Sequence, residues 1–125
     1  MAERIARITA GGVSADALLN DSDTADKIWD ALPVTGSAST WGDEIYFSIP
    51  VKLPAAAGAG PVVAMGDLAY WPPGAAFCIF FGLTPASQGS EIRAASAVNV
   101  FGKVQGDPKV FKQVRSGDAV LVERA

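Results

Sequence analysis

Short, strand-like runs with many apolar residues recur along most of the chain, separated by Gly and Pro, a pattern that favours short β-strands over long helices. Residues 3–9 and 13–19 are two such runs on either side of a glycine pair, and they predict a β-hairpin. Five further runs predict strands at residues 41–49, 62–71, 76–82, 97–104 and 119–124. The stretches 50–61 and 83–95 are rich in Pro, Gly or polar residues, and we expect them to be loops.

One segment has the period of an α-helix instead. Between residues 20 and 33, four apolar residues share one helical face: Ala25, Ile28, Trp29 and Leu32. Asp21 or Ser22 can cap the start of this helix, and Pro33 ends it. A single further helical turn is expected within residues 105–118, with Phe111 packed inward.

Seven or eight short strands with one or two short helices predict a mainly β protein, either a sandwich or a closed barrel. Closure is favoured because it removes the exposed edges of such apolar strands. The chain has 125 residues, of which 50% are hydrophobic, and its mean hydropathy is +0.26. With no repeat or linker visible, residues 1–125 are expected to form one domain.

Charge and residue usage narrow the function classes. The net charge is −3, and the ten lysines and arginines are scattered, so nucleic acid is not an expected partner. The charged N-terminus lacks the apolar core of a secretory signal, and no apolar run approaches the ~20 residues that cross a bilayer. We therefore expect a cytoplasmic protein with no membrane partner. A chain with no histidine and one cysteine, Cys78, is expected to hold neither a metal nor another cofactor.

The most apolar segment is "GDLAYWPPGAAFCIFFGLTP", residues 66–85. Together with "WGDEIYF" (41–47), "VNVFGKVQGD" (98–107) and the helix "TADKIWDALP" (24–33), it resembles a family of small, functionally uncharacterised prokaryotic proteins with a cyclophilin-like barrel. The resemblance covers nearly the whole chain. It implies a closed eight-stranded antiparallel β-barrel with one or two short helices.

A weaker resemblance to true cyclophilins bears on enzymatic activity. "CIFFG" (78–82) and "VFGKV" (100–104) are similar to two of their strands. Cyclophilins catalyse prolyl isomerisation with an arginine between the first helix and the strand that matches "WGDEIYF". The corresponding interval here is "VTGSAST" (34–40), and no arginine occurs between Arg7 and Arg93. The resemblance therefore implies the fold without the catalytic arginine.

Eight residues are predicted to line a ligand pocket: Trp41, Glu44, Tyr46, Tyr70, Phe80, Phe81, Thr84 and Asn99. Aromatic side chains supply apolar walls, and a carboxylate gives polarity. Because strand neighbours point to opposite faces, at most one of Tyr70 and Trp71 can line a given cavity. The same holds for Phe80 and Phe81. Asn99 lies in an apolar strand, so its amide is expected either to hold a neighbouring loop or to address a ligand.

Three functions remain open from these residues. The leading hypothesis is a non-catalytic binding module for a peptide or small molecule, with an aromatic, mildly acidic pocket. The second is an enzyme: a divergent prolyl isomerase, or a hydrolase or lyase that uses Glu44 or Asp43 as its base. The third is a homo-oligomer in which residues 66–85 pack against a second copy.

Overall fold

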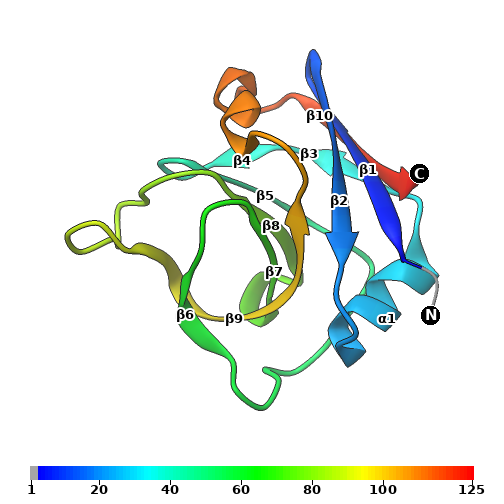
Figure 1. The fold of residues 1–125 in the computed structure, drawn as a ribbon, viewed down its shortest axis with the longest axis horizontal. Helices are drawn as coiled ribbons and strands as arrows, with labels where there is room; N and C mark the ends of the chain where they lie inside the picture. The colour runs from blue at the N-terminus through cyan, green and yellow to red at the C-terminus, as the bar shows by residue number, and fades with distance from the viewer. Residues whose placement is uncertain (1–2) are drawn as a thin grey trace.

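The computed structural model describes residues 3–125, and within them the chain forms ten strands, one α-helix and two short 3-10 helices (Figure 1). The strands are β1 (Ile5–Ala10), β2 (Val13–Leu19), β3 (Val34–Ser37), β4 (Ser39–Thr40), β5 (Glu44–Ser48), β6 (Gly60–Val63), β7 (Asp67–Trp71), β8 (Ala76–Phe80), β9 (Ile92–Val104) and β10 (Ala119–Arg124). The helices are α1 (Asp23–Ala31), η1 (Pro72–Gly74) and η2 (Pro108–Gln113).

The strands pair in the order β3-β10-β1-β2-β9-β7-β8-β5-β4, each with an antiparallel neighbour, and β6 pairs with β9 beside this path. The mainly β, antiparallel architecture is therefore confirmed. The two ends of the path, β3 and β4, are consecutive in the chain with only Ala38 between them. No pairing within residues 3–125 joins these ends, so the predicted closed barrel of eight strands is not confirmed.

The predicted helix and the first hairpin are both present. The Ser22 side chain accepts a hydrogen bond from the Ala25 amide and caps α1, whose apolar face is buried. β1 and β2 pair directly across the predicted glycine turn. The expected helical turn near the C-terminus is η2, and its Phe111 side chain is fully buried.

The most apolar segment forms the β7–η1–β8 hairpin, with Pro-Pro-Gly as its bend. Both strands are buried on both faces, and strand alternation divides their side chains between two apolar clusters. The main core receives Leu68, Tyr70, Phe77 and Ile79. The second cluster consists of Val63, Ala69, Ala76, Cys78, Phe80, Ile92, Ala94 and Val98, with Tyr46 and Trp71 packed against it.

β9 connects the two clusters because it is long and serves two sets of partners. Residues 99–104 pair with β7 and β2 in the main sheet, whereas residues 92–98 pair with β6. In Figure 1 this strand curves away from the main sheet toward β6. Its first half brings Ile92, Ala94 and Val98 into the second cluster.

Three boundaries differ from the prediction. Residues 34–40, expected to carry no strand, form β3 and β4, because pairing with β10 and β5 outweighs the weak β-propensity of Gly, Ser and Ala. Residues 62–71, expected as one strand, are divided by a turn in which Gly66 has a φ of 86°. β9 starts at Ile92, inside the predicted loop 83–95. As for membranes, none of the helices in residues 3–125 has the length and apolar character to cross one.

Candidate functional site

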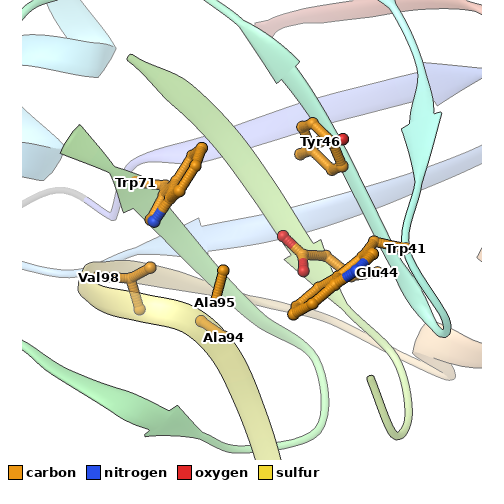
Figure 2. Close-up of a pocket in the computed structure, with 7 residues that line it drawn as sticks. All are labelled: Trp41, Glu44, Tyr46, Trp71, Ala94, Ala95 and Val98. Carbon is orange, nitrogen blue, oxygen red and sulfur yellow. The ribbon is translucent and has the colours of Figure 1, made fainter. Parts of the chain in front are cut away.

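A cavity of about 270 Å³ lies over the face of β5 and β7 that is turned away from the main core (Figure 2). Seven residues line it: Trp41, Glu44, Tyr46, Trp71, Ala94, Ala95 and Val98. Glu44 and Tyr46 are two positions apart on β5 and so share a face. The opposite wall is the first half of β9, which reaches the site through its bend.

Glu44 is the one acidic residue among the seven. It is only 5% exposed, and its carboxylate points into the cavity between the rings of Trp41 and Trp71 (Figure 2). Burial raises the pKa of Glu44 to about 7, against a smaller opposing effect of the Cys78 thiol on the neighbouring strand. Within residues 3–125, no lysine or arginine forms an ion pair with it. The cavity therefore contains a carboxyl group that changes charge near neutral pH.

The aromatic walls are held by contacts outside the cavity. Trp71 is half-buried, and its indole Nε1 donates a hydrogen bond of 2.7 Å to the Ser96 hydroxyl, which ties β7 to β9. Tyr46 packs against the second cluster. These contacts fix the two rings without using the carboxylate of Glu44.

Trp41 is positioned by a tight turn that joins it to β5. The Asp43 amide donates to the Leu83 carbonyl at 2.9 Å, and the Asp43 carbonyl accepts from the Phe81 amide at 2.9 Å. Gly42, between Trp41 and Asp43, has a φ of 61°, and a Cβ at this position would lie 2.8 Å from the Leu83 oxygen. Only glycine fits this approach without a shift of the backbone.

Asp43 and Glu44 do not act as a pair in this structure. The Asp43 carboxylate lies 3.7 Å from the Lys112 ammonium group, and it is not among the residues that line the cavity. Asp43 lies in the turn before β5 and Glu44 is the first residue of that strand, so the two side chains take different directions. Of the two carboxylates considered from the sequence, only Glu44 faces the cavity.

Three of the eight predicted site residues, Trp41, Glu44 and Tyr46, line the cavity together. Phe80 is fully buried in the second cluster, directly opposite Glu44 in the pairing of β5 with β8. Phe81 instead packs in the main core, where its ring centroid lies 6.3 Å from that of Phe111. Phe80 and Phe81 thus divide between the two clusters, as strand alternation requires.

The remaining three predicted residues hold loops in place. The Tyr70 hydroxyl donates to the Val51 carbonyl at 2.7 Å from within the main core. Thr84 is buried, and its hydroxyl donates to the Arg93 carbonyl, which joins the 83–91 loop to β9. Tyr70, Thr84 and Asn99 all lie outside the lining of this cavity, and a ligand contact by any of them stays a prediction.

Asn99 is buried, and its side-chain amide is hydrogen-bonded to other residues of the chain. Its Oδ1 accepts from the Ala56 amide at 2.8 Å, and its Nδ2 donates to the Pro54 carbonyl at 3.1 Å. Nδ2 also lies 3.3 Å from the Thr24 hydroxyl. Of the two roles left open by the sequence, the structure shows the loop-holding one.

Four lining residues were absent from the predicted set: Trp71, Ala94, Ala95 and Val98. The alternation rule admitted either Tyr70 or Trp71 but could not tell which face of β7 meets the main core. Alanine and valine carry no chemical signal in a sequence, and their place in the site depends on the bend of β9. Their small side chains leave the space that the cavity occupies.

This arrangement can hold an apolar group, donate or accept one proton, and pair with one positive charge. It does not provide the ligands for a metal ion: among residues 3–125, no three Cys, Asp or Glu side chains are grouped closely enough to bind one.

The comparisons with known proteins agree with this fold. The Cyclophilin-like family profile matches residues 4–123. The solution structure of the hypothetical protein AF2241 from Archaeoglobus fulgidus is similar, with a TM-score of 0.83 and 41% sequence identity over 98% of this chain and 95% of that chain. No curated protein matches. On both the profile and the structural similarity, the chain belongs to the small, functionally uncharacterised cyclophilin-like family.

Proposed function

We propose that this protein is a non-catalytic binding module that holds a small molecule, or one side chain of a peptide, in the cavity between β5, β7 and β9. The observation that carries the proposal is the cavity itself, with three aromatic rings around a single buried carboxylate. Ligand sites are typically concave and mostly apolar, with a few polar groups that orient the ligand. A volume of about 270 Å³ suits a small ligand or a single side chain.

The placement of the cavity supports this assignment. It lies over the second cluster, whereas the main core is filled by other side chains of the same strands. A ligand can therefore enter without displacing the main core. The apolar hairpin 66–85, which suggested a homo-oligomer, is covered within its own chain along β7 and β8. We therefore favour ligand binding over self-association as the role of this region.

An enzymatic role has one observation in its favour. A carboxyl group with a pKa of about 7 is suited to take up or release a proton at neutral pH. This makes Glu44 the base of the alternative hydrolase or lyase. Prolyl isomerisation has less support, because no arginine within residues 3–125 lines the cavity. A proline-peptide assay that showed catalysis above the uncatalysed rate would reverse this preference.

The three tryptophans allow a direct test of binding. Trp41 and Trp71 line the cavity, whereas Trp29 lies on α1 with the Arg124 guanidinium 4.6 Å from its ring centre. In a heteronuclear NMR screen of small molecules and short peptides, a ligand should shift the Trp41 and Trp71 signals and leave Trp29 unchanged. Trp71→Ala should abolish the response. Hits that shift Trp29 alone, or that survive Trp71→Ala, would contradict the proposed site.

A further inference from the structure

We propose that the cavity selects organic monocations, such as an alkylated ammonium group, with the positive charge beside the Glu44 carboxylate and the carbon substituents against Trp41 and Trp71. The inference rests on the proposed function and adds the chemical class of the ligand. Its starting point is the position of a lone buried carboxylate between aromatic rings (Figure 2).

The carboxylate has no charge partner inside the chain. Every ion pair in residues 3–125 joins other residues, and the nearest acidic neighbour in sequence, Asp43, pairs with Lys112 on η2. Burial of an ionised carboxylate without a partner is unfavourable, and a cation from outside removes that penalty. The geometry therefore favours a ligand that brings a positive charge to Glu44.

The walls decide which kind of cation fits. Calcium and magnesium require several oxygen ligands, and this cavity offers one carboxylate surrounded by Trp41, Tyr46, Trp71 and small apolar side chains. Aromatic rings attract cations, and organic ammonium groups with weakly hydrated alkyl surfaces gain most from such rings. Ala94 and Ala95 leave room for the alkyl groups at the β9 wall.

The charge of Glu44 couples binding to pH. Cys78 on β8 is the titratable side chain that faces it from a neighbouring strand, and burial raises the pKa of that thiol so that it stays neutral. The facing stretch of β9, residues 94–98, is Ala-Ala-Ser-Ala-Val and has no ionisable side chain. A cation binds the ionised form of Glu44, whose pKa is about 7. The apparent affinity of the cavity for a cation should therefore rise about tenfold between about pH 6 and about pH 8.

The test compares two probes of the same shape and different charge. Choline carries a quaternary ammonium group, and dimethylbutanol is its uncharged carbon isostere. Binding is followed through the indole signals of Trp41 and Trp71, with Trp29 as internal reference. At about pH 8 we expect choline to bind about tenfold more tightly than dimethylbutanol, and only choline to show the pH dependence.

Two neutral isosteric variants separate the role of Glu44 from a general effect of charge. Glu44→Gln should remove both the preference for choline and its pH dependence. Asp43→Asn removes the adjacent carboxylate, which faces Lys112, and should keep both. Equal binding of the two probes, with Trp41 and Trp71 shifted, would overturn the cation inference and leave the proposed function standing. Shifts from neither probe would also overturn the inference, and a failure of the wider ligand screen would overturn the proposed function.

Discussion

Replacing Glu44 with glutamine should stabilise the folded chain above neutral pH and have little effect in acid. In the folded chain burial raises the pKa of Glu44 from 4.5 to about 7, so folding favours its protonated form. Below pH 4.5 the group is protonated in both states and carries no penalty. Between pH 4.5 and about 7 the unfolded chain releases this proton while the folded chain retains it, so stability falls with pH; above about 7 both states are ionised and the loss is complete.

The pKa gives the size of the effect. A rise from 4.5 to about 7, at 1.36 kcal/mol for each pH unit, corresponds to roughly 3 kcal/mol of unfolding free energy between acid and alkaline conditions. The residue is only 5% exposed, but its carboxylate points into a cavity that solvent can enter, so this value is an upper one. Glutamine has nearly the same shape and no charge. The variant should therefore be more stable than the parent by up to roughly 3 kcal/mol at about pH 9 and within about 1 kcal/mol at about pH 4.

Urea unfolding followed by circular dichroism, at a series of pH values, measures this difference directly. The stability of the parent relative to Glu44→Gln should fall with pH, with most of the change between pH 4.5 and about 7. Asp43→Asn is the matched control, because that carboxylate is partly exposed and pairs with Lys112. If the parent and Glu44→Gln curves run parallel across this range, the carboxyl group is not buried as described and the reasoning fails.

Three further predictions concern the parts that hold the site. Gly42→Ala should lower the unfolding free energy by about 1–3 kcal/mol, because its Cβ would meet the loop after β8 and the residue has a positive φ. Gly12→Ala is the control in the same urea assay, since a Cβ at that position meets open space. Asn99→Ala should cost about 1–3 kcal/mol and accelerate hydrogen exchange at the Ala56 amide, which loses its acceptor; unchanged exchange would argue against this role. Burial raises the pKa of Cys78, so a thiol reagent should label it only as fast as the chain opens, and rapid labelling of the native protein would contradict its burial.

Strong local patterns made much of the fold predictable. The Pro-Pro-Gly bend and the two apolar runs around it gave the β7–η1–β8 hairpin, and the helical period with Ser22 as cap gave α1. β3 and β4 were missed because most of their residues are small or polar, and their extended conformation depends on the partner strand. The partner of β3 is β10, which is distant in sequence, so local pattern alone could not reveal this pairing.

Only those site residues were predictable whose side chains are charged or aromatic and lie close together in the sequence. Glu44 and Tyr46 were predicted because "WGDEIYF" places a carboxylate among aromatic residues, and in the structure the two lie two positions apart on one face of β5. The sequence could not show whether Tyr70 or Trp71 faces the cavity. Alternation places them on opposite faces of β7 but does not say which face packs on the main core. Ala94 and Ala95 were undetectable, because their contribution is the absence of bulk at a bend in β9.

The two apolar clusters explain how one small sheet can hold both a core and a cavity. Main-core side chains such as Tyr70 and Phe77 alternate with second-cluster side chains such as Trp71 and Cys78 along the same two strands. Loss of a main-core ring should therefore destabilise the chain strongly, whereas truncation of the half-buried Trp71 removes a cavity wall together with its packing on the second cluster and its hydrogen bond to Ser96. The lone carboxylate of Glu44 follows the same division. It destabilises the folded state at neutral pH and above, it has no internal charge partner, and it lies where an external ligand can supply one.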